Sequence, residues 1–175
     1  KTVLLSKIAV PTSMHHVRPV TILSSLYRLY SKVIFQVTAH VWKNFFPIQI
    51  SGGLPGRGVK EIAFAQKRKI EDFLDQGKSC GGLTMDLIKA FNTFGRFAVG
   101  SIMVRLGIPQ VIVDSWIRSL SLMVRYPTLD GYVGHAITST TGVPEGCSIS
   151  VLAMLATSCF FYCRILCQHV QPYTY

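Results

Sequence analysis

Acidic residues are scarce in this 175-residue sequence, with eight Asp and Glu against 18 Lys and Arg and a formal net charge of +10. An excess of positive charge favours a polyanionic partner, which is either nucleic acid or an anionic membrane surface. Charge alone does not distinguish these two. Hydrophobic residues make up 49% of the chain, so the composition is that of a folded domain with a core and not that of a disordered chain.

The sequence also lacks any Cys-x-x-Cys pair. Its five cysteines are Cys80, Cys147, Cys159, Cys163 and Cys167. An odd count without close pairs argues against a disulfide framework and for a reducing compartment. Cys159, Cys163 and Cys167 recur every fourth residue and would share one helical face. This spacing has two interpretations. A metal site is one, but zinc and iron–sulfur sites usually include a closer pair, so small apolar residues in a buried helix are the simpler one.

Long hydrophobic runs are nearly absent. The short apolar run between Lys1 and Lys7 is not expected to act as a secretory signal. Residues 147–163 form an uncharged stretch of 17 residues, which is at the lower limit for a membrane span. The hydroxyl residues within it favour a buried helix. A membrane-associated protein anchored by this stretch stays open as an alternative.

Several catalytic motifs are missing as well. The glycine-rich segment SGGLPGRG at 51–58 is not a P-loop, because Gly58 is followed by Val59 and not by Lys and a hydroxyl residue. No Gly-x-Ser-x-Gly elbow and no His-Glu-x-x-His helix occurs. His15 and His16 lie in an expected turn as a solvated pair. Arg57 in the glycine-rich loop either contacts a nucleic-acid backbone or belongs to an ordinary turn.

Hydrophobic periodicity and turn residues predict a mixed set of elements. In chain order these are strands at 2–10 and 17–23 forming a hairpin, helices at 24–42 and 59–76, a strand at 83–88, helices at 89–107 and 109–124, a hairpin around Asp130-Gly131, and a helix starting near Ser148. The expected helix ends are Ser24 or Ser25 as the cap of the first helix, Gly77 as the stop of the second, and Ser148 or Ser150 as the cap of the last. The second helix has an expected apolar stripe: Ile62, Phe64, Ala65, Ile70, Phe73 and Leu74. The helix at 24–42 carries a set of apolar residues at helical spacing: Leu26, Leu29, Tyr30, Val33, Ile34, Val37 and Val41. Strands and helices do not alternate regularly, so the predicted fold class is α+β.

Asp86 is the one acid in the expected strand LTMDLI. A carboxylate among apolar neighbours is costly unless it binds a cation or a strong donor, and Mg²⁺ prefers such hard oxygen ligands. An acid at an exposed strand end, or one paired with Lys89, is the alternative. From this residue alone the alternative is the simpler interpretation.

Four segments in order change that interpretation. They are RPVTILSSLYRLYSKVI from Arg18, GGLPGRGVKEIAFA, LTMDLIKAFNTF and TTGVPEGCSIS. Together they resemble the reverse transcriptase domain of non-LTR retrotransposons, with group II intron and telomerase enzymes as more distant relatives. Each motif alone is loose, but four in order with compatible spacing are specific. The resemblance extends from about Lys7 to about Leu155.

The resemblance implies a right-hand polymerase with fingers and a partial palm. Residues 1–79 would be a fingers-like segment with a hairpin and a template-side loop. Residues 80–175 would be a partial palm, interleaved with fingers helices, that carries the first metal-binding aspartate and a glycine turn. The implied activity is RNA-directed DNA synthesis, with an RNA template, a DNA primer and dNTP as ligands, Mg²⁺ as cofactor and no obligatory protein partner. The implied location is inside the cell, in the nucleus for a retroelement enzyme.

The resemblance also implies roles for individual residues. Lys7 and Arg18 match basic residues that hold the incoming triphosphate, which must be neutralised and aligned for in-line attack. Asp86 matches the first metal-binding aspartate, with the Leu87 carbonyl as a neighbouring ligand, and Phe91 matches the aromatic steric gate that rejects the 2′-hydroxyl of a ribonucleotide. Arg57 and its loop match the segment that contacts the template. A turn that packs on the nascent base pair is matched by Gly142, Pro144, Glu145 and Gly146. Within this set Asp86 is expected to be a metal ligand.

The sequence departs from the family pattern at several positions. Asn92 replaces a common acid, Glu145 replaces a common glutamine, Ser148 replaces a common proline, and Gly53 stands where an aromatic is preferred. The Tyr-x-Asp-Asp hairpin that supplies the other metal ligands is missing, since no Asp or Glu follows Glu145. We therefore expect a piece of the enzyme that is inactive by itself and exposes apolar surface. A decayed, non-catalytic nucleic-acid-binding remnant is the alternative.

Overall fold

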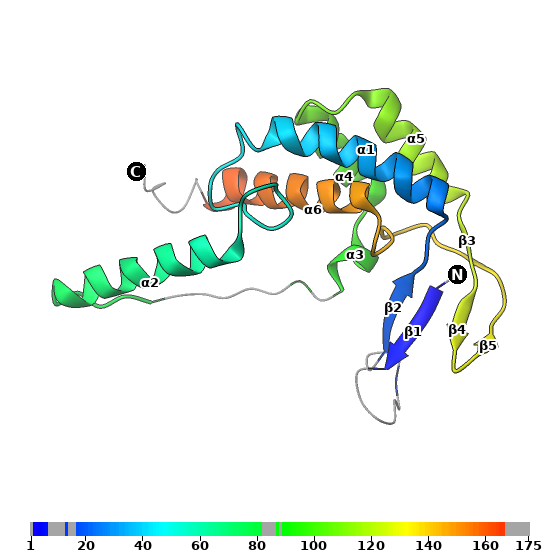
Figure 1. Cartoon of the computed structure of the whole chain (residues 1–175), viewed down its shortest axis with the longest axis horizontal. Helices are drawn as coiled ribbons and strands as arrows, with labels where there is room; N and C mark the ends of the chain where they lie inside the picture. The colour runs from blue at the N-terminus through cyan, green and yellow to red at the C-terminus, as the bar shows by residue number, and fades with distance from the viewer. Residues whose placement is uncertain (1, 7–12, 14–16, 82–86, 88, 167–175) are drawn as a thin grey trace.

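The computed structural model describes residues 2–6, 13, 17–81, 87 and 89–166 (Figure 1). Side chains of residues 6, 18, 165 and 166 are outside this description. In chain order the elements are β1 (Thr2–Ser6), β2 (Val17–Thr21), α1 (Ser25–Trp42), α2 (Val59–Asp75), α3 (Ala90–Thr93), α4 (Arg96–Arg105), α5 (Gln110–Ser121), β3 (Val124–Arg125), β4 (Pro127–Leu129), β5 (Tyr132–Val133), β6 (Ile137–Thr138), α6 (Ser148–Phe161) and a π-helical turn η2 (Tyr162–Leu166).

The strands form two small sheets. The larger has the order β2-β1-β4-β5, with β1 antiparallel to β2 and parallel to β4, and the smaller pairs β3 with β6. The predicted N-terminal hairpin is therefore confirmed. Pro19 lies opposite Leu4 on the edge strand β2, the position expected for a residue that cannot donate a ladder hydrogen bond. Because β1 pairs with β4, the sheet combines parts of 1–79 and 80–175.

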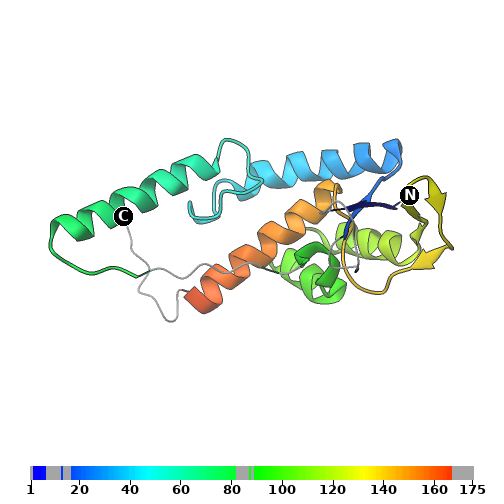
Figure 2. The same cartoon turned by 90° about the horizontal axis from the view of Figure 1, so that it is seen from below.

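The helical core is built around α6, which lies between α1 and α4, with α5 packed on α4 (Figures 1 and 2). Helix α6 contains no charged residue, and a helix that is apolar on all faces is stable only when it is surrounded. Trp42 at the end of α1 is 1% exposed and donates its indole N–H to the carbonyl of Leu106 at 3.0 Å. This bond ties α1 to the end of α4.

Helix α1 packs on α6 through a different face from the one its aliphatic residues predict. Its buried residues are Ser31, Ala39 and Trp42, and small residues let two helix backbones approach closely. Most of the aliphatic set faces solvent, with Leu26 82% exposed and Val37 65% exposed. Helical periodicity identified the helix correctly but not its packed face. The expectation of exposed apolar surface is confirmed here.

Helix α2 projects away from the rest of the molecule and buries none of its residues (Figures 1 and 2). The carboxylate of Glu61 accepts the N–H of Gly58 at 2.7 Å and so caps the helix start. Gly77 follows the helix with a φ of 66°, as predicted for a C-terminal stop. The expected apolar stripe of this helix is therefore mostly exposed.

The expected helix at 89–107 is divided into α3 and α4. Phe94 and Gly95 between them have extended backbone angles. The carbonyl of Phe94 accepts a hydrogen bond from Gly142 and not from its own helix, which explains the break. A second correction concerns α6, whose N-cap is Cys147 without a side-chain bond. The expectation that Ser148 or Ser150 caps this helix is wrong.

The α+β class and the hairpin at Asp130-Gly131 are confirmed. These two residues have φ angles of 48° and 85°, the left-handed pair that a two-residue hairpin turn requires. The predicted strand at 83–88 lies largely outside the described residues. In the part of the chain that the structure describes, no helix has the length and apolar character needed to cross a bilayer.

The described cysteines are all free and differ in exposure: Cys80 and Cys163 are exposed, whereas Cys147 and Cys159 are buried. Burial, and next the neighbouring Cys163, raise the pKa of Cys159 to about 11. Alkylation depends on the thiolate. At pH 8 iodoacetamide should modify Cys80 and Cys163 at least about tenfold faster than Cys147 and Cys159, as read by peptide mass spectrometry. In urea the difference should vanish, and equal rates in the native protein would contradict the burial pattern.

Candidate functional site

The turn at Gly142–Gly146 is bound by its backbone to the α3 region. The N–H of Gly142 donates to the carbonyl of Phe94 at 2.8 Å, and the N–H of Val143 donates to that of Phe91 at 2.6 Å. Gly142 has a φ of 72°, and a Cβ there would lie 2.5 Å from the carbonyl oxygen of Asn92. Only glycine fits so close to that backbone. The turn and the Phe91 segment are therefore fixed against each other.

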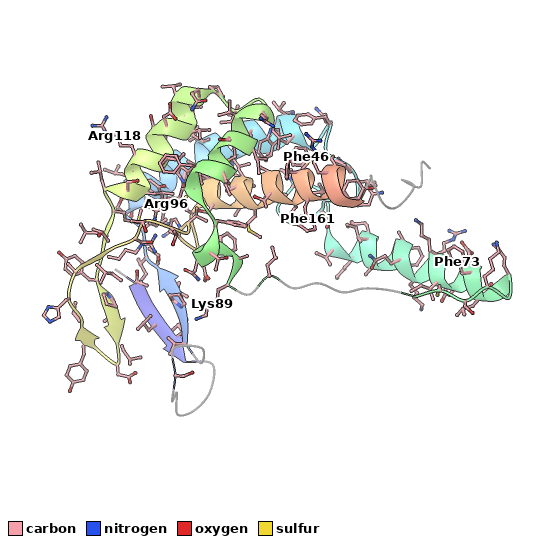
Figure 3. The ribbon with its side chains drawn as sticks, turned by 180° about the vertical axis from the view of Figure 1, so that it is seen from behind. Phe46, Phe73, Lys89, Arg96, Arg118 and Phe161 are labelled. Carbon is pink, nitrogen blue, oxygen red and sulfur yellow. The ribbon has the colours of Figure 1, made fainter. Side chains whose placement is uncertain are left out.

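Arg96 holds the chain that leads into this turn. Its Nε donates to the Gly142 carbonyl at 2.7 Å, and its Nη2 donates to the Thr141 carbonyl at 3.1 Å and to Ser139 Oγ at 3.4 Å. Arg96 is 3% exposed and lies where the start of α4 faces this chain (Figure 3). Burial, and next the charge of Arg125, lower the pKa of Arg96. Sequence analysis missed this residue, because a basic residue at the start of a helix gives no signal of the backbone carbonyls that it binds.

The other end of the turn reaches the N-terminal hairpin and α1. Gly146, with a φ of 87°, lies so close that a Cβ there would be 3.7 Å from the Thr21 carbonyl oxygen. The S–H of Cys147 donates to the hydroxyl oxygen of Tyr27 at 3.6 Å. Burial, and next Cys147, raise the pKa of Tyr27, so its hydroxyl stays protonated. The turn thus connects α3 to the end of β2, the strand that carries Arg18.

The residues predicted for the turn and gate lie together. Pro144 is buried, Glu145 and Phe91 are half-buried, and Gly146 is exposed. Leu87 is 60% exposed and lines a cavity of about 520 Å³ with Phe94 and residues of α6. The lining of this cavity is mainly apolar and includes no Lys or Arg side chain.

The basic and metal-binding positions are only partly described. Lys7 and Asp86 lie outside the described residues, and only the backbone of Arg18 is described, opposite Leu5 in the β1–β2 pair. Among the described residues, no three His, Cys, Asp or Glu side chains are close enough together to hold a metal ion. The described part of the chain therefore does not fit a complete Mg²⁺ site. That Asp86 lies close to Arg18 and to the Gly142–Gly146 turn stays a prediction.

Arg57 folds its own loop onto the end of α1. Its guanidinium donates to the carbonyls of Phe46 at 2.9 Å, Pro47 at 2.8 Å and Ile50 at 3.4 Å, and also to the carbonyl of Lys43. One planar fork thus satisfies several carbonyl groups at the end of a helix. These bonds support the interpretation that Arg57 belongs to an ordinary turn. They do not test whether Arg57 also contacts a template.

Replacing Arg57 with lysine should therefore destabilise the chain. Lysine keeps the charge but loses the fork, and we expect the free energy of unfolding in urea to fall by about 1–2 kcal/mol. Arg68→Lys on the exposed surface of α2 is the matched control and should leave stability unchanged. An unchanged R57K stability together with weaker nucleic-acid binding would instead favour the template role.

A comparison with protein families shows to which family the chain belongs. The family described as reverse transcriptase (RNA-dependent DNA polymerase) matches residues 9–160. The chain belongs to the reverse transcriptase family. All four segments that carry the resemblance lie inside the matched range. A search among curated proteins returned no match. Reverse transcriptases synthesise DNA from dNTP on a template and primer, and the basic composition of this chain suits such polyanionic ligands.

Proposed function

We propose that this chain forms the nucleotide-side and template-side part of a reverse transcriptase of the non-LTR retrotransposon type. In this proposal residues 1–79 belong to the fingers and residues 80–175 to the palm with its interleaved fingers helices. One observation carries the proposal: the Gly142–Gly146 turn is bonded to the Phe91–Phe94 segment and also reaches Thr21 at the end of the N-terminal hairpin. A nucleotide pocket in this family needs these three segments side by side.

Each segment would contribute one function. Lys7 and Arg18 would neutralise the triphosphate, because alignment of a highly charged anion is the main task in phosphoryl transfer. Phe91 would contact the sugar, and the residues Gly142, Pro144, Glu145 and Gly146 would pack on the nascent base pair. Mg²⁺ would meet the chain at Asp86 and the Leu87 carbonyl, where it would supply charge neutralisation for the phosphates.

Binding is the first test. Fluorescence anisotropy with an RNA template annealed to a DNA primer should show an affinity that falls linearly on a log–log plot as salt rises. Glu145→Gln should bind about fivefold tighter, because removing a carboxylate about 4 Å from a phosphate is worth about 1 kcal/mol even at the dielectric of water. Glu71→Gln, which removes the same charge from exposed α2, is the control. Binding that is absent at low salt, or independent of salt, would reject the proposal.

Catalysis is the second test. No acid follows Glu145 in the sequence, and a two-metal site needs carboxylates that converge on ions about 3.5–4 Å apart. We therefore expect the purified 175-residue chain to add no dNTP to the primer above the level of Asp86→Ala. Incorporation by the wild-type chain that is lost in D86A would overturn the expectation of inactivity and would support Asp86 as the metal ligand.

A non-catalytic nucleic-acid-binding protein is the second candidate. Asn92 stands where the family usually has an acid, and its side-chain Nδ2 is buried without a hydrogen-bond partner among the described residues. An amide at this position lacks the charge with which a carboxylate would bind Mg²⁺, and this loss favours the second candidate. Salt-dependent binding of the template–primer without selectivity for the dNTP that pairs with the template supports this candidate. Selective retention of the matching dNTP supports the first.

A further inference from the structure

A second cavity has a mixed lining of polar and apolar residues. Its volume is about 270 Å³, which exceeds the about 30 Å³ that one water occupies in the liquid and leaves room for a small anion. It lies between the start of α1, the end of α5 and strand β3, which Figure 1 shows side by side. The lining residues are Thr21, Ile22, Leu23, Ser24, Tyr27, Ser119, Met123, Val124 and Arg125. No acidic side chain is among them.

Arg125 in this cavity carries a charge without a partner. Its Nε and Nη2 atoms are buried and have no hydrogen-bond partner in the part of the chain that the structure describes. Burial lowers the pKa of Arg125, yet a guanidinium remains charged in proteins. The residue as a whole is only half-buried, but buried donors without acceptors are unfavourable. Guanidinium donors held in this state match an anion that supplies two acceptors in one plane.

Further groups around the cavity favour negative charge. The first turn of the 18-residue helix α1 contains no acidic residue, so the positive end of its dipole is not compensated there. The Tyr27 hydroxyl accepts from Cys147 and keeps its own hydrogen for donation. Arg96 is near enough for its charge to interact with that of Arg125. One guanidinium group, the Tyr27 hydroxyl and the start of α1 thus line one cavity, while the donors of Arg96 are bound to the chain at Ser139, Thr141 and Gly142.

We propose that the cavity between α1, α5 and β3 binds a phosphate group through the guanidinium group of Arg125, which turns its unpaired donors toward the anion when it binds. Arg125 lies outside the four sequence segments that define the family resemblance, whereas Thr21, Ser24 and Tyr27 on the opposite wall of the cavity belong to the first of them. Two sources supply the same chemistry: a phosphodiester of a bound nucleic acid and a phosphate of a free nucleotide. The choice of source rests on the proposed function, whereas the anion site itself does not.

Inorganic phosphate is the probe for the site. The full chain is titrated with sodium phosphate, and with sodium chloride at matched ionic strength, while its thermal melting and the heat of binding are measured. Wild type should gain in melting temperature with phosphate beyond the chloride series. Arg125→Met should lose at least about tenfold in phosphate affinity, since charge-assisted bonds are lost. Without phosphate, R125M should melt no lower than wild type, because two buried donors without acceptors have been removed.

Arg118→Met is the matched control, since this arginine extends from α5 into solvent (Figure 3); it should behave as wild type. Equal stabilisation of wild type by phosphate and chloride, or an unchanged affinity in R125M, would overturn the site. If R125M does not melt cooperatively, the phosphate affinity of Arg125→Lys is measured instead. Lysine keeps the charge without the fork, so a several-fold loss supports the site and an unchanged affinity rejects it.

Competition identifies the source of the phosphate. An RNA oligonucleotide without terminal phosphates and a dNTP are each added to wild type and R125M. Weaker RNA binding in R125M assigns the site to the nucleic-acid backbone, and weaker dNTP binding assigns it to a nucleotide. If wild type and R125M bind RNA equally and also bind phosphate with equal affinity, the anion site is wrong. The proposed function is tested separately, by salt dependence and by Glu145→Gln, and would still stand.

Discussion

Replacing Gly142 with alanine is expected to lower the free energy of unfolding by about 3 kcal/mol, because two separate costs combine. The φ of 72° is unfavourable for any residue with a Cβ. The new methyl group would also lie 2.5 Å from the Asn92 carbonyl oxygen and 2.9 Å from its Cα, and backbone cannot rotate away as a side chain would. Urea denaturation followed by circular dichroism measures this loss, and template–primer binding should weaken in parallel.

Gly77→Ala separates the two costs. Gly77 has a similar φ of 66°, but a Cβ there would meet no atom within 4 Å. Its replacement should therefore cost only the conformational part, about 1 kcal/mol. Equal losses in G77A and G142A would mean that the contact between the turn and Asn92 adds nothing to stability. The turn would then be held less tightly than its hydrogen bonds indicate.

Arg96→Met is expected to destabilise the chain by about 3 kcal/mol, because it leaves buried acceptors of the turn without donors. The carbonyls of Gly142 and Thr141 lose their bonds to Nε and Nη2. Relief of repulsion with Arg125 offsets part of this cost. Urea denaturation gives the free energy, and the amide hydrogen exchange of residues 139–146 should accelerate more than that of α6.

The matched control is Arg105→Met at the exposed end of α4. This arginine lies in the last turn of the helix, where its charge interacts favourably with the helix dipole and its loss should cost about 0.5 kcal/mol. If R96M costs no more than R105M, the bonds from Arg96 are not what holds the turn. A large loss in R96M with unchanged exchange at 139–146 would point to general core packing instead.

The sequence was informative wherever structure depends on neighbouring residues. Ser24 accepts the N–H of Tyr27 at 3.3 Å and starts α1 as predicted. Gly77 ends α2, and Asp130-Gly131 forms the bend of a hairpin. Each signal needs only a short stretch of chain and the steric limits of one or two residues. Such features are readable without knowledge of the tertiary fold.

The structural features that the sequence did not predict depend on contacts between residues far apart in the chain. The packed face of α1 includes Ser31, Ala39 and Trp42, and which face meets α6 is not contained in the periodicity within α1. Arg57 and Arg96 both bind backbone carbonyls, and carbonyls carry no residue-specific signal. The order of motifs indicated which segments meet at the site. It did not indicate that Phe91 and Phe94 bind the turn through their backbones.

Helix α2 has a consequence for how this protein loses its structure. A helix that buries no residue is maintained by intrinsic propensity, by the Glu61 cap and by pairs such as Lys67 with Glu71 at 3.7 Å, each worth only a few tenths of a kcal/mol to about 1 kcal/mol. Its opening is therefore not coupled to the tryptophan-containing core. Heating or denaturant should melt α2 early and over a broad range, ahead of one cooperative transition, so a single two-state free energy describes only the remainder of the chain.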